Sequence, residues 1–185
     1  TTVLGKIITS FYFLIYVFVS FKMQGLMLKV IDASLLIYFL LIATSVPLID
    51  AQLLASPSFF PETLVRLKNW YVQEYGDYLM KETPHFFVGL LWLQMIFQWP
   101  VALLCIVGIL SRRPWLPTTC LLYGSSAMAS TAAILGELIY SGRATQKLLI
   151  MYCPFMLVAI VSFVRGLVAG TGRSPESITS HMKHL

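Results

Sequence analysis

The feature that most constrains this sequence is an apolar stretch at residues 86–110, which contains no charged side chain. At a rise of 1.5 Å per residue, about 20 helical residues cross the roughly 30 Å hydrocarbon core of a bilayer. The stretch is therefore long enough to span a membrane with some tilt. Three further apolar stretches, at about 31–49, 115–140 and 148–169, meet the same requirement. The sequence predicts an all-α, polytopic membrane protein built as a bundle of four transmembrane helices.

The composition supports this class and argues against two others. Hydrophobic residues make up 58% of the 185 residues and charged residues 11%, which leaves too little polar surface for a soluble domain of this size. The net charge is +5, but the basic residues are scattered, as expected for charges that set membrane topology and not for a nucleic-acid surface. The three cysteines lie far apart in the sequence, so we expect neither a disulfide framework nor a metal site, and no cofactor.

The chain divides into three parts. Residues 23–170 hold the four predicted spans and form the membrane domain. Residues 1–22 are apolar over a length that is short for a span, so they fit an extra short span, a signal-like segment, or sequence upstream of a start at Met23 or Met27. We favour the last two and leave this segment out of the functional argument. Residues 171–185 form a polar tail that we expect to be disordered.

Prolines predict one helix start and two kinks. Thr83 and Pro84 are typical of the N-cap and the first helical position of the second span. Pro100 inside that span and Pro154 near the start of the last span each remove a backbone donor, which predicts a kink. Kinked helices separate from one another, and this makes a cavity between them easier to form.

The long loop at residues 51–85 contains an amphipathic helix of its own. Pro61 can begin this helix and Gly76 can end it. Four apolar or aromatic side chains fall on one side at helical spacing: Leu64, Leu67, Tyr71 and Tyr75. Such an aromatic-rich helix is typical of the membrane interface. Two interpretations remain open, a lid over a pocket between the spans and a simple interfacial anchor.

Asp50 is the candidate functional residue that side-chain chemistry singles out. It follows the first predicted span, in the sequence Pro47-Leu-Ile-Asp50-Ala-Gln52, at the edge of the hydrocarbon region. An ionisable group at membrane depth is costly, and it is retained mainly where it has a partner or a function. A carboxylate is suited to the recognition of a cation. We therefore predict a membrane-embedded site with Asp50 as its anionic group.

Five short blocks of sequence match a known family in order and spacing. They are Pro47-Leu-Ile-Asp50-Ala-Gln52, Leu67-Lys-Asn-Trp-Tyr71, Glu82-Thr-Pro-His-Phe-Phe87, Gln94-Met-Ile-Phe-Gln98-Trp-Pro100 and Tyr152-Cys-Pro154. Over about residues 23–170 the chain resembles the EXPERA membrane family, and within it the sigma-2 receptor (sigma intracellular receptor) branch. The resemblance implies a four-helix, multi-pass protein of the endoplasmic reticulum membrane, with an EXPERA-like fold, an interfacial loop between helices 1 and 2, and a pocket open to lipid.

The resemblance also implies a ligand and a set of site residues. Family members bind sterols and amphiphilic amines and are tied to cholesterol homeostasis, and the aspartate that matches Asp50 pairs with the ligand ammonium. A glutamate that hydrogen-bonds to this aspartate is replaced here by Gln94. Two acids in contact tend to share a proton, whereas Gln94 offers an amide donor to a single carboxylate. We therefore expect amine binding to survive with a different pH dependence.

The remaining candidate ligand-binding residues could equally serve ordinary interhelical packing. Gln98 lies one helical turn beyond Gln94, so the two amides are expected to face the same way. The others match family pocket positions or lie at plausible ones on the third and fourth spans: Tyr123, Ser130, Tyr152 and Phe155.

Three functions remain open. The first is binding of a sterol or amphiphilic amine, for sterol homeostasis or trafficking. The second is a sterol Δ8–Δ7 isomerase like that of the emopamil-binding branch, which needs a proton donor and a proton acceptor. Because Gln94 is a poor acid and a poor base, and Glu137 is an uncertain second acid, we favour binding and expect no catalytic residue. The third is a membrane adaptor for a lipid-transport protein, contacted through the loop and the tail.

The expected partners are membrane lipids, the ligand and such a transport protein. Small residues at 124–130 allow close helix contact within one chain or between two, so a homodimer also remains open.

Overall fold

The structure is a computed structural model that describes residues 25–171. The chain divides into two units, 1–33 and 34–185, and the contacts described below lie within the second unit. The segment 1–22 and the tail after residue 171, for which we made predictions, lie outside the described residues. The longer helices are α2 (Gly25–Leu48), α5 (His85–Leu93), α6 (Trp99–Leu110), α7 (Leu116–Tyr140) and α8 (Gln146–Thr171).

The four predicted spans are confirmed. Four helical segments of the described chain are long and apolar enough to cross a membrane: Met27–Leu53, His85–Leu110, Leu116–Tyr140 and Gln146–Val168. Large apolar side chains such as Ile37, Ile96 and Ile150 are exposed on them. In a bilayer these side chains face lipid tails, which are as apolar as they are. The protein is therefore an all-α, multi-pass membrane protein.

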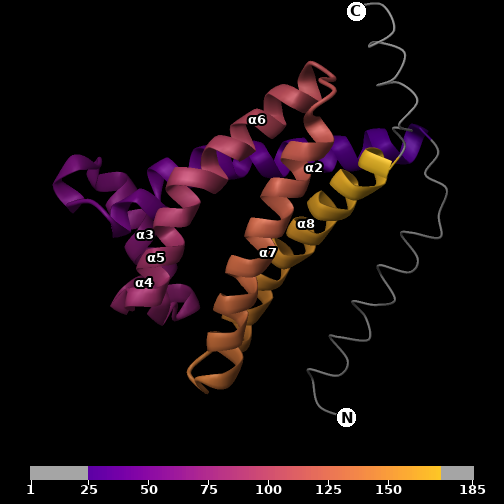
Figure 1. Cartoon of the computed structure of the whole chain (residues 1–185). Helices are drawn as coiled ribbons and strands as arrows, with labels where there is room; N and C mark the ends of the chain where they lie inside the picture. The colour runs from indigo at the N-terminus through magenta and orange to yellow at the C-terminus, as the bar shows by residue number, and fades with distance from the viewer. Residues whose placement is uncertain (1–24, 172–185) are drawn as a thin grey trace, which may run out of the picture. The chain divides into compact units, whose positions relative to one another are not determined.

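Helices α7 and α8 run side by side over most of their length (Figure 1). Gly124 of α7 makes this possible, because a Cβ atom there would lie only 2.4 Å from the backbone nitrogen of Phe163. Gly166 of α8 has the same role, since its Cβ atom would lie 2.6 Å from the carbonyl oxygen of Pro117. The backbones thus touch directly, as is common for small residues in membrane helices. At Gly124, the close contact that the sequence allowed is used within the chain.

The second span is not one regular helix. A π-helical turn, η3 (Gln94–Gln98), separates α5 from α6, and Pro100 lies at the start of α6. A π turn inserts one extra residue into the helix and often marks a functional site. The indole nitrogen of Trp99 donates to the carbonyl oxygen of Ala43 at 3.1 Å, and this bond holds the interrupted span against α2. The span is therefore irregular close to Pro100, where a kink was predicted, because a π turn ends two residues before this proline.

The prediction that Thr83 caps the second span is wrong. The N-cap of α5 is Pro84, and Thr83 instead ends the short helix α4 (Tyr78–Glu82) in a left-handed conformation with φ of 43°. Its backbone N–H bonds to the carbonyl oxygen of Leu79 at 3.0 Å. Because Thr83 is the left-handed C-cap of the preceding helix, it cannot take the extended conformation that an N-cap requires.

The loop between the first two spans is folded. It contains the 3₁₀ turns η1 (Asp50–Leu53) and η2 (Pro57–Phe59), followed by α3 (Glu62–Tyr75) and then α4. Pro61 precedes α3, and Gly76 ends it at φ of 65°, as predicted. On the predicted face Leu64, Tyr71 and Tyr75 are partly buried, whereas Leu67 is exposed.

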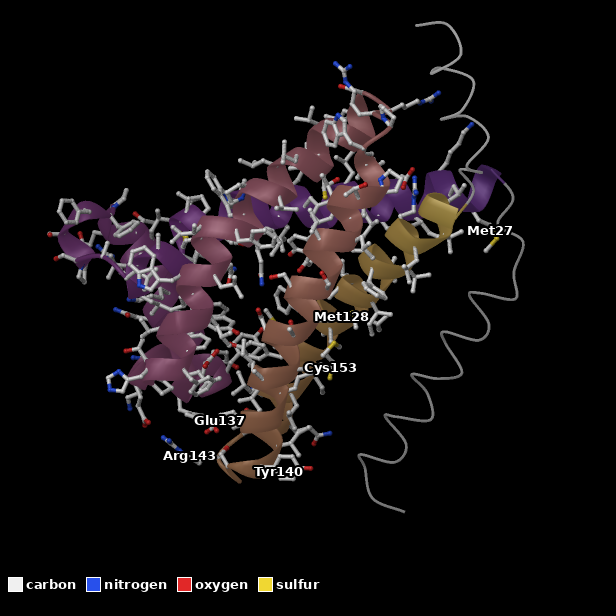
Figure 2. All side chains as sticks on the ribbon, viewed as in Figure 1. Met27, Met128, Glu137, Tyr140, Arg143 and Cys153 are labelled. Carbon is white, nitrogen blue, oxygen red and sulfur yellow. The ribbon has the colours of Figure 1, made fainter. Side chains whose placement is uncertain are left out.

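Contacts from α7, α8 and the turn between them hold this loop in place. The Arg143 guanidinium pairs with Glu82 and lies 4.2 Å from the centre of the Tyr78 ring. The Tyr78 hydroxyl is within hydrogen-bond distance, 2.8 Å, of the Ser141 hydroxyl. Figure 2 shows Arg143 and Glu137 together at this end of α7.

Asp77 is the buried centre of the loop, and sequence analysis did not identify it. Its carboxylate accepts the backbone N–H of Met80 at 3.1 Å, which caps α4, and the Tyr152 hydroxyl of α8 at 2.9 Å. The side chain has no exposed surface. Loss of hydration raises the pKa of the Asp77 carboxyl, and these hydrogen bonds to the charged form only partly offset the effect. A single acid therefore joins the loop to the last span.

We expect Gly124→Ala to destabilise the fold by about 1–3 kcal/mol, because the added methyl group forces two helix backbones apart. Thermal unfolding of the purified protein in detergent measures this change. Gly136→Ala on the same helix is the matched control, since a Cβ atom there has no neighbour within 4 Å. Equal melting temperatures for the two variants would contradict the close packing of α7 and α8.

We expect the free energy of unfolding to fall as the pH rises from the ordinary aspartate value of 3.8 through the raised pKa of Asp77. The reason is that the folded protein then holds the Asp77 proton more tightly than the unfolded chain does. Asp77→Asn should remove this part of the pH dependence. Tyr152→Phe deletes a hydrogen bond to the charged form, so it should extend the fall to higher pH. Unfolding curves recorded over a pH series give the free energy of unfolding of the original protein and both variants. Identical pH profiles would refute the raised pKa of Asp77.

Candidate functional site

A cavity of about 310 Å³ lies among the spans of the second unit. Its walls come from α2, α5, η3, α7 and α8, and Tyr71 and Met80 of the loop contribute from α3 and α4. The volume falls at the lower end of the range of small-molecule sites. All seven candidate residues line it: Asp50, Gln94, Gln98, Tyr123, Ser130, Tyr152 and Phe155. The fold thus brings together side chains that are spread over a hundred residues of sequence.

Asp50 reaches the cavity because α2 ends just before it. Pro47 lies in the last turn of α2, and the chain then tightens into the 3₁₀ turn that begins at Asp50. The amide nitrogen of Gln52 donates to the carbonyl oxygen of Leu48 at 2.6 Å, so a buried side chain satisfies a carbonyl at the helix end. Gln52 was quoted in the sequence motif, but its positioning role is evident only in the structure.

The Asp50 carboxylate meets the second span directly. The amide nitrogen of Gln94 donates to its Oδ2 atom at 2.9 Å. Gln94 is the first residue of the π turn, so the irregular part of the span supplies this contact. The side chains that line the cavity include no lysine, arginine or histidine, and Asp50 is the one acid among them. The cavity therefore offers an anionic group without a cationic partner of its own.

Gln98 ends the π turn and binds α7. Its amide nitrogen donates to the hydroxyl oxygens of Ser126 at 3.0 Å and Ser130 at 2.9 Å. The Ser130 hydroxyl donates its own proton to the backbone carbonyl of Ser126 at 3.1 Å, so towards Gln98 it can only accept. This requirement sets the orientation of the amide group.

Aromatic side chains form another part of the cavity wall. Tyr152 donates to Asp77, and its ring packs against Phe155 with the centroids 6.3 Å apart. Tyr71 of α3 stacks on Tyr75 at 4.8 Å and also lines the cavity. Helix α3 therefore contributes to one wall, as the lid interpretation expects. Its exposed Trp70 still suits a membrane interface, so the anchor interpretation is compatible with the same helix.

Two further acids, Glu137 and Asp77, lie near the cavity but do not line it. Glu137 is not among the lining residues, and it accepts a hydrogen bond from Tyr78 at 3.3 Å near the end of α7. Asp77 is the acid that lies behind the wall, one hydrogen bond away from Tyr152. Within residues 25–171, no group of three or more histidine, cysteine, aspartate or glutamate side chains could hold a metal ion.

Tyr38 is a lining residue that sequence analysis missed. Its hydroxyl lies 3.1 Å from that of Tyr123, and its ring packs edge to face against Phe39. The available signal was a lone phenol inside an otherwise apolar span, which is a weak one because tyrosine is common in such helices.

Comparison with known proteins agrees with the resemblance seen in the sequence. The family described as EXPERA (EXPanded EBP superfamily) matches residues 63–166, more than half of the chain. Sigma intracellular receptor 2 of Xenopus tropicalis is 24% identical over 156 residues, which cover 76% of this chain and 91% of that protein. The protein of the same name from Homo sapiens is 23% identical over 144 residues, covering 69% of this chain and 82% of that protein. The chain belongs to the EXPERA family of membrane proteins.

Proposed function

We propose that this protein binds amphiphilic cationic amines and sterols in the cavity between its spans, with Asp50 as the counter-ion for a ligand ammonium. The single observation that carries the proposal is the Asp50 carboxylate in a cavity whose lining includes no basic side chain. By analogy with the sigma intracellular receptors, we further propose a location in the endoplasmic reticulum membrane and a role in sterol homeostasis or trafficking.

The cavity combines one acidic group with apolar walls. A carboxylate away from bulk water is attracted strongly to a cation, because little solvent screens the pair. Apolar side chains surround this acid, among them Leu41, Ile42, Phe87 and Leu91. Apolar ligand surface that they shield from water stabilises the complex by about 25 cal/mol per Å². A ligand with one positive group on a hydrophobic body satisfies both requirements. A sterol hydroxyl can donate a hydrogen bond to the same carboxylate.

Gln94 prepares the carboxylate for this task. Its amide donates to one carboxylate oxygen, Oδ2, and so leaves the other available to a ligand. A hydrogen bond from a neutral donor stabilises the charged form without neutralising it. The contact itself brings no positive charge to Asp50, so a ligand cation would be the group that neutralises the carboxylate.

We expect Asp50→Asn to lower the affinity for a hydrophobic tertiary amine by about 10- to 100-fold, because the charge that pairs with the ammonium is lost. Binding of a neutral sterol should change much less. Equilibrium binding to the protein in lipid nanodiscs measures both ligands. Glu62→Gln is the matched control, since it removes the same charge from an exposed position on α3. Unchanged amine affinity in Asp50→Asn would refute the proposed pairing.

We expect Gln94→Glu to change how amine binding depends on pH. Two carboxylates at hydrogen-bond distance share a proton, and they titrate in two coupled steps. An amine must displace the shared proton in this variant, whereas the original site has a single carboxylate. Amine affinity measured over a pH series should therefore follow one titration in the original protein and two in the variant. Gln73→Glu on the exposed side of α3 is the charge control, and identical profiles would count against the contact.

A further inference from the structure

The cavity has a second polar feature, well away from Asp50. Tyr38 of α2 and Tyr123 of α7 both line it, and their hydroxyl oxygens lie 3.1 Å apart. Tyr123 is only 2% exposed. Aromatic rings hold both phenols in place: the Tyr123 ring packs edge to face on Phe39 at 4.9 Å, and the Tyr38 ring meets Phe155 at 6.3 Å. We call Tyr38 and Tyr123 the tyrosine pair.

The tyrosine pair has one proton more than its own hydrogen bond uses. Each phenol carries one donor, and the bond between them uses one of the two. Neither hydroxyl has another acceptor among the side chains and backbone of residues 25–171. Buried donors are almost always matched by an acceptor, because an unmatched one loses its hydration without compensation. The missing acceptor must therefore come from whatever fills the cavity.

The position of the pair relative to Asp50 indicates the shape of that occupant. Tyr38 and Asp50 lie on the same span, twelve residues apart, which corresponds to about 18 Å along a helix axis. Apolar side chains from several helices line the cavity besides these polar groups, among them Ile42, Leu91 and Ala127. The cavity thus combines an anionic group, an apolar region and a neutral donor.

We propose that the cavity takes an elongated ligand with a polar group at each end, a cationic nitrogen at Asp50 and an oxygen acceptor at the tyrosine pair. The inference rests on the proposed function and narrows its ligand class. A hydroxyl, ether or keto oxygen can accept the spare phenolic proton. An amine with a bare hydrocarbon tail leaves that donor unmatched, so it binds less well than a ligand of the same length that carries a terminal oxygen.

Two matched probes test this inference: dodecylamine and its ω-hydroxy derivative, with their decyl and tetradecyl homologues to vary the length. Binding is measured by displacement of a fluorescent amine from the full chain in nanodiscs. In the double variant Tyr38→Phe, Tyr123→Phe, we expect the ω-hydroxy amine of best length to lose about fivefold in affinity, as for one neutral hydrogen bond. Dodecylamine should change by less than about twofold, since it never used the donor. Each probe is compared with itself, as its affinity for the double variant relative to the original protein. Differences in lipid partitioning between the probes therefore cancel.

Tyr140→Phe is the matched control, because this phenol is 75% exposed at the end of α7 (Figure 2). It should leave both affinities unchanged. The double variant keeps every aromatic ring, and its thermal unfolding shows whether the fold is intact. If the fold is lost, the original protein still decides the matter through an ω-methoxy amine, which can only accept. After correction for partitioning into protein-free nanodiscs, that probe should bind more tightly than an alkylamine of equal length.

The outcomes separate the two proposals. Equal losses for both probes in the double variant, or no loss for either, would overturn the role of the tyrosine pair. So would equal affinities of the methoxy and alkyl probes. If dodecylamine fails to bind, or binds equally well to Asp50→Asn, the proposed function itself fails. If dodecylamine binding depends on Asp50 but the terminal oxygen adds nothing, only the second polar feature is refuted.

Discussion

A carboxylate at membrane depth has no bulk water to solvate it, so the protein must supply its partners. The bond from Gln94 to Asp50 is the central example in this structure. It requires α2 to end where it does and the second span to lose its regular winding at the same level. Asp50 at the end of α2 and both end residues of the π turn, Gln94 and Gln98, line the cavity, the setting in which irregular backbone is tolerated in a membrane protein. The candidate site is therefore a direct consequence of satisfying one acid.

Close packing of α7 on α8 and the cavity lie in different parts of the bundle. Gly124 and Gly166 bring α7 and α8 into backbone contact, so no ligand fits between them there. The cavity lies instead beside the π turn, where Gln98 donates hydrogen bonds to Ser126 and Ser130 of α7. Small residues on α7 and aromatic residues along α2 and α8 thus have complementary effects. The first group allows the two helices to pack closely, and the second lines the cavity beside them.

The spans and much of the loop could be predicted from the sequence because hydropathy, proline and glycine act within a single segment. Hydropathy and length are properties of a single segment, so the four spans were predictable, as were the limits of α3 at Pro61 and Gly76. Asp50 and Gln94 were predictable in part from chemistry and in part from the family resemblance. Their contact joins residues 44 positions apart, which local patterns alone do not reveal. The Thr83 prediction failed for a related reason, since two adjoining helices competed for one residue and the shorter one was not anticipated.

The residues that were missed are those whose roles depend on distant partners. Asp77 looked like an ordinary loop acid, yet it binds Tyr152 across 75 positions and so connects the loop to the wall of the cavity. Tyr38 looked like one aromatic residue among many, yet it meets Tyr123 across 85 positions. In both cases a tyrosine hydroxyl from one span finds its partner on another element. A phenol can pack as a hydrophobic ring and still donate one hydrogen bond, so it can place a directional donor deep in an apolar bundle at little cost. Tyr38 and Tyr152 both use this combination, since each ring packs against other aromatic side chains while its hydroxyl meets a partner on another element.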